Sequence, residues 1–409
     1  MTAPSAHDPI RALLVENIHP SAAERLTRAG IEVERIDRAV DTEELVKRLD
    51  GVDVLGIRSG THVTAEVLAQ APRLQAVGAF CIGTNQIDLP TATERGVAVF
   101  NAPFSNTRSV VELAVAEIIA LTRRLTVQND AMHAGQWRKS AKGSHELRGR
   151  TLGIVGYGKI GSQLSVLAEA LGMRVQFFDT ADRLALGNAQ RCLSMDELLA
   201  DADVVTLHVD GRPGNSSLFG EEEFARMKPG AIFLNLSRGF VVDHAALRRH
   251  IDSGRVAGAA VDVFPTEPAA SGDPFESELR GLPNVILTPH IGGSTEEAQQ
   301  DIGEFVAGKL LGYLSAGTTA LSVNLPEVQL ERSPGTSRLL LLHQNRPGAL
   351  AHLNGVLGDG GLNIEQQILS TAGAVGYAVT DVNGEVPQSV IDVLCDMAET
   401  IRVETLPAA

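Results

Sequence analysis

The chain has 409 residues, of which 44% are hydrophobic and 21% are charged, the balance of a globular protein that buries a large core. Because this length exceeds one ordinary domain, two or three domains are expected. The formal net charge of −15 argues against nucleic acid and against an anionic membrane as partners, since both require a basic face.

The N-terminal residues and the cysteines bear on the cellular compartment. The N-terminus lacks the basic flank and long apolar run of a signal peptide, and no segment approaches ~18 uninterrupted apolar residues. Cys81, Cys192 and Cys395 are widely spaced and odd in number, so we interpret them as reduced, mostly buried thiols and not as a disulfide framework or a metal site. A cytoplasmic protein without a bound metal is expected.

Strands and helices alternate over the first hundred residues, which predicts a parallel sheet. In such a sheet the functional loops follow the carboxyl ends of the strands. Candidate loops are therefore Arg58-Ser59-Gly60, after the third strand, and residues 81–85, after the fourth. The expected strands are 11–15, 31–35, 52–57 and 74–80, and the expected helices are 21–29 and 42–49.

A long apolar helix is expected over residues 110–125. It is followed by a basic segment, residues 138–150, which holds five Arg or Lys residues and one acid. Two interpretations of this segment stay open, a solvated linker face or a local cationic lip that attracts an anionic substrate.

Residues 151–179 contain an apolar run, then Gly156, Gly158 and Gly161, a helix-like segment, and a second apolar run that ends in Asp179. This order is typical of the dinucleotide-binding βαβ unit. The first glycine permits a tight turn, the second lets the backbone approach a pyrophosphate at the helix N-terminus, and the third allows close packing of helix on strand. A carboxylate at Asp179 would accept hydrogen bonds from ribose hydroxyls and repel a 2′-phosphate, so NAD is expected in preference to NADP.

Later strand-like runs complete a Rossmann sheet. They lie at 204–209, 231–236, 257–263 and 285–287. A helix over 295–314 is expected to pack back on the first domain, which would make that domain discontinuous. Residues 315–337 are expected to form an extended linker. The residues beyond it follow the order strand, helix, strand, strand, helix, strand, which predicts a ferredoxin-like unit.

Three polar residues follow strands of the predicted Rossmann sheet. Arg238 comes after the strand 231–236, Glu267 after 257–263, and His290 after 285–287. An Arg binds a substrate carboxylate with two donors, and a His exchanges the hydroxyl proton while hydride moves to or from nicotinamide. A Glu bonded to the other imidazole nitrogen fixes the tautomer and favours the protonated ring. Each residue alone has an ordinary structural explanation, but their coincidence at strand ends predicts a dehydrogenase site.

The runs GYGKIG, NLSRG, DVFPTEP and TPHIGGST resemble the D-isomer-specific 2-hydroxyacid dehydrogenases. The runs GIRSGTHVT, CIGTNQIDL, VFNAPFSNTRSV and HQNRPGAL are similar to the bacterial members that act on 3-phospho-D-glycerate and end in an ACT regulatory domain. The resemblance covers essentially the whole chain. It implies an α/β fold in which a Rossmann-type NAD-binding domain (106–292) is inserted in a flavodoxin-like substrate-binding domain (1–105 and 293–336), followed by a ferredoxin-like ACT domain (337–409).

The resemblance also implies an activity and its residues. The activity is NAD-dependent oxidation of 3-phospho-D-glycerate to 3-phosphohydroxypyruvate, the first step of L-serine biosynthesis, with feedback inhibition by L-serine and a side reduction of 2-oxoglutarate to 2-hydroxyglutarate. The assembly implied is a homo-oligomer, with a tetramer favoured. The implied residues are Arg238, Glu267 and His290 for catalysis; Gly156, Gly158, Lys159, Ile160, Gly161, Asp179, Leu236, Ser237, Arg238, Asp262, His290, Gly292 and Gly293 for NAD; Arg58, Ser59, Asn106 and Lys139 for the substrate; and His343, Asn345 and Asn363 for L-serine.

One position departs from the pattern of the family. Some bacterial relatives carry a second Arg where this chain has Gly60, so binding of the phosphate is expected to depend more on Arg58 and Lys139.

Other functions fit parts of the sequence. The same chemistry on an unphosphorylated acid, such as glycerate, lactate or a dicarboxylic 2-hydroxy acid, is disfavoured by the basic residues near the site and by the residues of the serine site. A regulator that keeps the fold and NAD binding but acts by protein contact is disfavoured by the intact Arg238, Glu267 and His290. A pure amino-acid-binding protein fits least, because the ACT unit is under a fifth of the chain.

Overall fold

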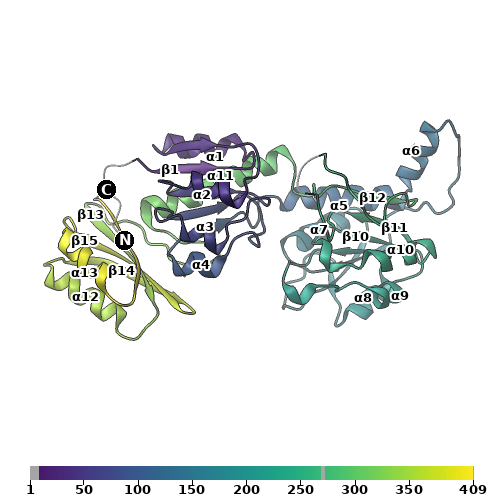
Figure 1. The fold of residues 1–409 in the computed structure, drawn as a ribbon. Coiled ribbons are helices and arrows are strands. Elements are labelled where there is room, and N and C mark those ends of the chain that lie inside the picture. Colours follow the sequence, from purple (N-terminus) through teal and green to yellow (C-terminus); the bar gives the residue numbers. More distant parts are fainter. Residues whose placement is uncertain (1–8, 269–271, 409) are drawn as a thin grey trace. The chain divides into compact units, whose positions relative to one another are not determined.

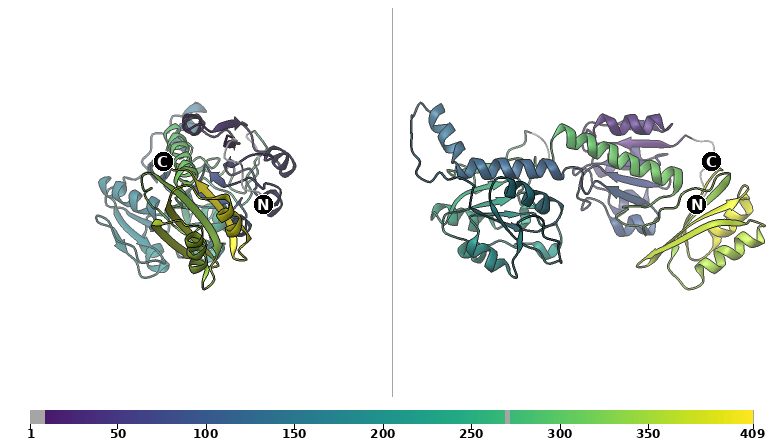
Figure 2. Two further views of the ribbon diagram at one scale, coloured as in Figure 1. Left: turned by 90° about the vertical axis from the view of Figure 1, so that its left-hand side faces the viewer. Right: turned by 180° about the vertical axis from the view of Figure 1, so that it is seen from behind.

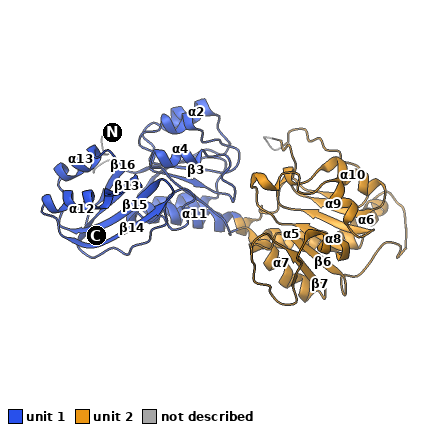
Figure 3. Ribbon diagram, turned by 90° about the horizontal axis from the view of Figure 1, so that it is seen from below, with its two compact units in different colours: residues 1–105, 299–409 blue, residues 106–298 orange. Residues whose placement is uncertain are grey.

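The computed structural model describes residues 9–268 and 272–408. Contacts within the chain separate it into two units, which are coloured in Figure 3: unit 1 consists of residues 1–105 and 299–409, and unit 2 of residues 106–298. Unit 1 therefore combines two segments that are far apart in the sequence. The contacts group the C-terminal sheet with the first sheet, and the division into three functional domains stays a prediction.

The N-terminal part of unit 1 is a five-stranded parallel sheet in the order β2-β1-β3-β4-β5. Side chains of β1 alternate between two cores, because Ala12 and Leu14 face one and Leu13 faces the other. With both faces buried, the inner strands β3 and β4 consist of continuous apolar runs, as buried parallel strands do, whereas the edge strand β2 is mostly exposed and charged. The strands are β1 (Arg11–Leu14), β2 (Glu32–Arg35), β3 (Val54–Ile57), β4 (Ala76–Ala79) and β5 (Ala98–Asn101).

Helices cover both faces of this sheet. On one face lie α1 (Pro20–Arg28) and the long helix α11 (Glu296–Ala316), which Figure 2 shows running across the sheet. A Cβ atom at Gly78 of β4 would come within 2.8 Å of the Val306 side chain, so this glycine lets α11 approach the sheet closely. The packing of the 295–314 helix on the first sheet is thus confirmed. The other face carries α2 (Thr42–Arg48), α3 (Ala65–Ala69) and α4 (Leu89–Glu94).

The C-terminal part of unit 1 is a four-stranded antiparallel sheet in the order β14-β15-β13-β16, the ferredoxin-like arrangement expected from the sequence. Its two helices cover one face of the sheet (Figure 1). Leu339 and Leu341 lie on this face and pack against the helices. The alternate residues Leu340 and Leu342 join the core of the first sheet. The elements are β13 (Thr336–Gln344), α12 (Ala349–Asp359), β14 (Ile364–Ala372), β15 (Val375–Asn383), α13 (Gln388–Asp396) and β16 (Thr400–Leu406).

A fully buried ion pair ties the linker to this sheet. Arg338 Nε donates to Asp381 Oδ1 at 2.6 Å and Nη2 donates to Oδ2 at 2.8 Å, and neither side chain is exposed. The same guanidinium donates to the carbonyl oxygens of Ala316, Leu330 and Glu331, which lie at the end of α11 and in the linker. Because all five donors are used, the charge is both paired and hydrogen-bonded, as a buried charge must be.

Unit 2 is a seven-stranded parallel sheet in the order β12-β11-β10-β9-β6-β7-β8. The chain runs from β6 outward to β8 and then returns to β9 on the other side of β6. The order therefore reverses between β6 and β9, which is where ligands bind in open α/β sheets. The strands are β6 (Thr151–Val155), β7 (Arg174–Phe178), β8 (Gln190–Arg191), β9 (Val204–Leu207), β10 (Ala231–Asn235), β11 (Val256–Val261) and β12 (Val285–Leu287).

Alternation along β10 divides the core of unit 2 between two faces. Ala231 and Phe233 pack toward α8, α9 and α10, whereas Ile232 and Leu234 pack toward α5 and α7. The helices are α5 (Thr107–Thr122), α6 (Leu125–His133), α7 (Lys159–Ala170), α8 (Met195–Asp201), α9 (Glu221–Arg226) and α10 (His244–Asp252), with 3-10 turns η1 (Pro213–Asn215) and η2 (Gly239–Val241).

Some features differ from the sequence analysis. Helix α6 was not predicted, because none of its residues is buried and it has no apolar face to detect. Of the three cysteines only Cys192 is buried, which raises the pKa of its thiol to about 11, while Cys395 is exposed. No helix among the described residues is long and apolar enough to cross a membrane.

Candidate active site

The turn after β6 has the geometry that a dinucleotide requires. Gly156 has φ +92°, and a Cβ atom there would lie 2.7 Å from the carbonyl oxygen of His208, which follows β9. A Cβ at Gly161 would lie 2.4 Å from the Gly156 carbonyl oxygen, so this glycine brings α7 against the turn. Space is open around Gly158, the residue that caps α7. The backbone N–H groups at the start of α7 are thus accessible to a pyrophosphate.

Asp179 follows β7 and is held by backbone donors. Its Oδ2 accepts from the N–H of Tyr157 at 2.8 Å and its Oδ1 accepts from the N–H of Ala181 at 2.8 Å. Arg183 Nε lies 3.6 Å from Oδ2. The carboxylate is fixed beside the glycine turn with acceptor capacity left for ribose hydroxyls, so this part of unit 2 fits NAD.

His290 and Glu267 form a hydrogen-bonded pair. They follow the neighbouring parallel strands β12 and β11, and His290 Nδ1 lies 2.8 Å from Glu267 Oε2. The other carboxylate oxygen, Oε1, accepts from the backbone N–H of Phe264 at 3.1 Å. The Nε2 atom of His290 therefore faces away from the pair and is the nitrogen available to a substrate.

The interaction raises the pKa of His290 and lowers the pKa of Glu267. The hydrogen bond from Glu267 raises the pKa of His290, although burial and the positive charge of Arg238 act against it. Burial alone would raise the pKa of Glu267, but hydrogen bonds from His290 and the Phe264 N–H, with the charges of His290 and Arg238, lower it. Both shifts favour an imidazolium–carboxylate pair.

Asp262 shapes the loop that carries His290. Its buried carboxylate accepts from the Thr288 hydroxyl at 2.6 Å and from the N–H groups of Ile291 and Gly292 at 2.8 Å each. Its carbonyl oxygen accepts from the N–H of His290 at 2.8 Å. His290 itself has φ +53°, a left-handed conformation that costs a non-glycine residue of order 1–3 kcal/mol. The hydrogen bonds to Asp262 maintain this conformation.

Arg238 is positioned by Asn235, the last residue of β10. Asn235 Nδ2 donates to the Arg238 carbonyl oxygen at 3.1 Å, and its Oδ1 accepts from the N–H and hydroxyl of Ser237 at 3.1 and 2.7 Å. At Gly239 a Cβ atom would lie 1.9 Å from the carbonyl carbon of Phe264, so only glycine lets the 238–241 turn pass this close to the loop of Glu267. Asn235 and Thr288 are not among the predicted site residues, although each is a polar residue at the end of an apolar strand.

The other predicted residues are distributed over both units. Arg58 and Ser59 belong to unit 1, whereas Asn106 and Lys139 belong to unit 2. Asn106 contacts the loop of His290, since a Cβ on Gly293 would lie 2.2 Å from Asn106 Nδ2, and its buried Oδ1 has no hydrogen-bond partner among the described residues. The remaining predicted NAD residues lie in the first turn of α7 (Lys159, Ile160), after β10 (Leu236, Ser237) and after β12 (Gly292, Gly293).

The predicted serine-binding residues lie at two turns of the C-terminal sheet. Asn345 follows β13 and its Nδ2 donates to the Gly373 carbonyl oxygen at 3.1 Å; Asn363 precedes β14 and its Nδ2 donates to Glu365 at 3.2 Å. Both are exposed, whereas His343 is 2% exposed and its ring packs against Gly376. Within one chain, Asn345 and Asn363 are therefore the accessible members of this group.

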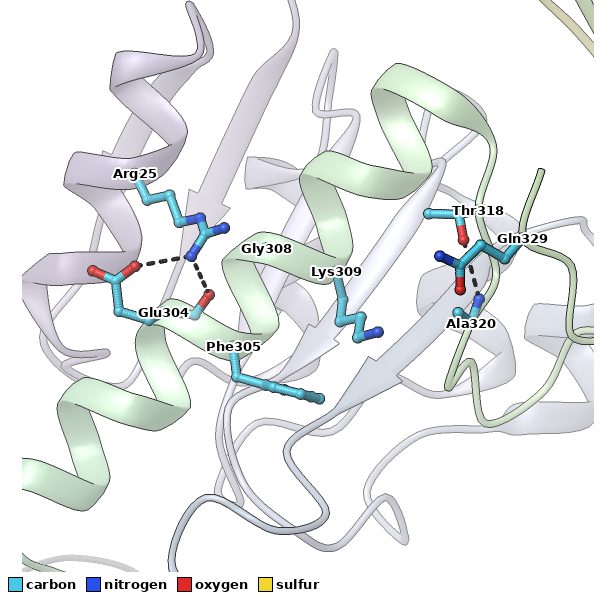
Figure 4. Close-up of a pocket in the computed structure, with 8 residues that line it drawn as sticks. All are labelled: Arg25, Glu304, Phe305, Gly308, Lys309, Thr318, Ala320 and Gln329. Atoms are coloured by element: carbon cyan, nitrogen blue, oxygen red, sulfur yellow. Dashed lines mark hydrogen bonds and ion pairs between the residues drawn. The ribbon is translucent and has the colours of Figure 1, made fainter. Parts of the chain in front are cut away.

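A hollow of about 320 Å³ in unit 1 contains none of these residues. It lies between α1, α11 and the linker (Figure 4), where Arg25 pairs with Glu304 at 3.0 Å and Lys309 lies 5.5 Å from the ring centre of Phe305. Its charges are thus already partnered by protein groups. Among the described residues, no group of His, Cys, Asp and Glu is placed to hold a metal ion.

Two family models match the chain. The NAD-binding domain of the D-isomer specific 2-hydroxyacid dehydrogenases matches residues 115–292, which include the glycine turn and the His290–Glu267 pair. An ACT domain of the type found in AHAS small subunits matches residues 339–402.

Similar proteins extend over almost the whole chain. A D-3-phosphoglycerate dehydrogenase from Haemophilus influenzae is 49% identical over 97% of this chain and 97% of its own length. One from Escherichia coli K12 is 47% identical over 98% of each. Among solved structures, a D-lactate dehydrogenase from Aquifex aeolicus, complexed with NAD and lactic acid, is 27% identical and superimposes with a TM-score of 0.65 over 74% of this chain and 95% of that one.

Proposed function

The chain belongs to the D-3-phosphoglycerate dehydrogenases, within the D-isomer-specific 2-hydroxyacid dehydrogenases, and on this premise we propose that it oxidises 3-phospho-D-glycerate to 3-phosphohydroxypyruvate with NAD. The observation that carries the proposal is the 2.8 Å pair of His290 and Glu267 in the same unit as a fitting dinucleotide turn. The reaction would open L-serine biosynthesis.

Each residue of the pair and Arg238 has a defined role in this reaction. Arg238 binds the substrate carboxylate with two donors and holds the adjacent C2 centre beside His290. The C2 hydroxyl proton moves to Nε2 of His290 as the C2–H bond breaks and the C2–O bond becomes a carbonyl. Glu267 stabilises the imidazolium that results. The glycine turn and Asp179 would hold NAD⁺, which would supply the acceptor for the hydride that leaves C2.

The phosphate is assigned to Arg58 and Lys139. Neither side chain has a hydrogen bond or ion pair with another residue in the part of the chain that the structure describes, so both charges are available to an anion. Replacing either residue with Ala should raise the KM for phosphohydroxypyruvate more than the KM for hydroxypyruvate, which lacks only the phosphate. Replacing Arg148, an exposed arginine of the same basic segment paired with Glu146, is the control and should change neither. Equal rises for both substrates would contradict the assignment.

We assign regulation to the ACT unit, with L-serine as the effector. The exposed amides of Asn345 and Asn363 both donate and accept hydrogen bonds, which suits an amino acid. Serine would bridge two copies of the ACT unit in a homo-oligomer, with a tetramer favoured, and inhibit by binding the less active arrangement more tightly. Three free cysteines fit a reducing compartment such as the cytoplasm.

The test of the activity is an NADH oxidation assay over a panel of 2-keto acids. Phosphohydroxypyruvate should have the highest kcat/KM, with slower reduction of 2-oxoglutarate to 2-hydroxyglutarate. A higher kcat/KM for an unphosphorylated acid would overturn the substrate assignment but not the reaction class. Absence of turnover with every 2-keto acid would favour a role by protein contact.

A further inference from the structure

The loop that carries Arg58 is held by a carboxylate from the neighbouring strand. Glu16 follows β1, which pairs with β3, and its Oε1 accepts from the N–H groups of Arg58 at 3.0 Å and Thr61 at 2.8 Å. Its Oε2 accepts from the N–H of Gly60 at 2.7 Å. One side chain thus binds three of the four backbone donors of residues 58–61.

The backbone of Glu16 has a strained conformation that places its side chain next to this loop. Glu16 has φ +65° and Asn17 has φ +51°, left-handed values that non-glycine residues adopt only when the surroundings impose them. The N–H of Glu16 donates to the Arg38 carbonyl oxygen at 3.0 Å and that of Asn17 to the Ile36 carbonyl oxygen at 3.3 Å. These bonds maintain the turn that presents the Glu16 carboxylate to residues 58–61.

The carbonyl side of Arg58 is held by a second residue. Gln86 is 4% exposed, and its Nε2 donates to the Arg58 carbonyl oxygen at 2.6 Å and to the Gly83 carbonyl oxygen at 3.3 Å. Gln86 therefore connects the loop after β3 to the loop after β4. With Glu16 on its N–H and Gln86 on its C=O, the backbone of Arg58 is fixed from both sides.

This arrangement decides which groups of the loop can bind an anion. Converging backbone N–H groups are an anion site in themselves, but here the Glu16 carboxylate occupies them. Gly60 adds no charged side chain. Among residues 58–61 the positive charge for an anion therefore comes from the Arg58 guanidinium, which has no hydrogen bond or ion pair in the described part of the chain, and the N–H of Ser59 is the one backbone donor that Glu16 does not bind.

We propose that Glu16 and Gln86 are positioning residues that make the enzyme selective for phosphorylated 2-hydroxy and 2-keto acids by fixing the backbone of Arg58. The proposal rests on the proposed function, because it requires Arg58 to meet the substrate phosphate. A guanidinium on a fixed backbone loses less conformational freedom on binding than one on a mobile loop. The selectivity is thus built into two residues that do not touch the substrate.

The test compares Glu16→Gln with a matched control at the other end of the paired strands β1 and β3. The control is Asp53→Asn, because Asp53 precedes β3, is 1% exposed, and also accepts from a backbone N–H, that of Arg11 at 2.9 Å. Since Asp53 also pairs with Arg73 at 3.2 Å, this variant additionally removes an ion pair and perturbs the same sheet at least as strongly. In Glu16→Gln an amide NH₂ replaces one acceptor, so a backbone donor loses its partner. We expect the KM for phosphohydroxypyruvate to rise roughly tenfold, with little change in kcat or in the KM for hydroxypyruvate. Asp53→Asn should leave the ratio of the two KM values unchanged.

A second variant and a second measurement distinguish the loss of Arg58 positioning from a general folding defect. Gln86→Met keeps the side-chain length and removes both donors, so it should change the KM ratio in the same direction. Hydrogen–deuterium exchange should accelerate at residues 58–61 in Glu16→Gln and not in Asp53→Asn. An unchanged KM ratio, or an equal change in Asp53→Asn, would overturn the proposal. If the wild-type enzyme itself did not prefer phosphohydroxypyruvate, the proposed function would fail, and the proposal with it, before any variant was measured.

Discussion

His290 and Glu267 meet at 2.8 Å between Nδ1 and Oε2, although 23 positions separate them in the chain. They come together because β11 and β12 are parallel neighbours, so the loops after both strands lie at the same edge of the sheet. The pairing leaves Nε2 of His290 for the substrate.

Replacing His290 with Ala should lower turnover by a factor of about 10² to 10⁴, the usual range for loss of a general acid–base. NADH should still bind, because the glycine turn and Asp179 do not depend on the imidazole. Steady-state kinetics with phosphohydroxypyruvate and NADH fluorescence titration measure the two effects. Near-normal turnover in a folded variant would remove His290 from the mechanism.

Glu267→Gln should shift the pH dependence of the reaction. Because Glu267 raises the pKa of His290, its loss lowers that pKa. Keto-acid reduction needs the imidazolium, so the fall of kcat/KM with rising pH should move to lower pH; hydroxyacid oxidation needs the neutral ring, so its rise should move the same way. The control is Glu276→Gln, an exposed carboxylate of the same unit paired with Arg280. A profile that does not move would mean that another group titrates.

Asp179 should exclude NADP by repulsion of its 2′-phosphate. We expect kcat/KM with NADPH to be at least about tenfold below that with NADH, equivalent to ~1.4 kcal/mol. Asp179→Asn should reduce this difference, mainly by weakening NADH. Equal efficiency of the wild-type enzyme with both cofactors would show that the carboxylate, although beside the turn, does not meet the ribose.

L-Serine should inhibit the enzyme and D-serine should not. Asn345→Ala and Asn363→Ala should relieve the inhibition without loss of basal activity, because both residues lie in the ACT unit and not among the catalytic residues. Asn354→Ala, on α12 of the same unit, is a control that should stay sensitive. If saturating L-serine changes neither activity nor thermal stability, the ACT unit has a different effector or serves only in assembly.

Arg338→Leu should destabilise the C-terminal part of unit 1 by about 3–5 kcal/mol, the range for breaking a buried ion pair, because Asp381 would keep a buried charge without its main partner. Urea unfolding measures the loss. Lys47→Ala, which removes an exposed ion pair with Glu43, should change stability little.

The same pair predicts a pH dependence of stability. Burial alone would raise the pKa of Asp381, but hydrogen bonds from Arg338, Gln366 and the Ser333 N–H lower it. A carboxyl with a depressed folded-state pKa contributes its full stability above its unfolded pKa of about 3.9 and loses it as the pH falls through the folded value. The difference in unfolding free energy between the wild type and Arg338→Leu should therefore shrink as the pH falls through the folded pKa of Asp381, because protonation removes the ion pair from the wild type and the unpaired charge from the variant.

Local pattern was sufficient for the fold class and for most of the strands, whereas β5 and several short helices, among them α3 and α9, had no predicted range. The strand, glycine turn and helix around Gly156 follow from neighbouring residues. The structure adds that Leu339 and Leu340, consecutive residues of one apolar run, face two different cores. The strand-end positions of Arg238, Glu267 and His290 were also readable, because in a parallel sheet the end of an apolar run marks the edge where ligands bind.

The tertiary structure decided what holds these residues in place. The carboxylate of Glu16 reaches backbone donors more than 40 positions away, Asp262 reaches the loop of His290, and Arg338 reaches both Asp381 and the linker. Sequence spacing carries no signal for such bonds, because they join segments that only the pairing of strands brings together. For the same reason α6 escaped prediction: a helix that buries no side chain leaves no periodic pattern, and only the path of the folded chain reveals it.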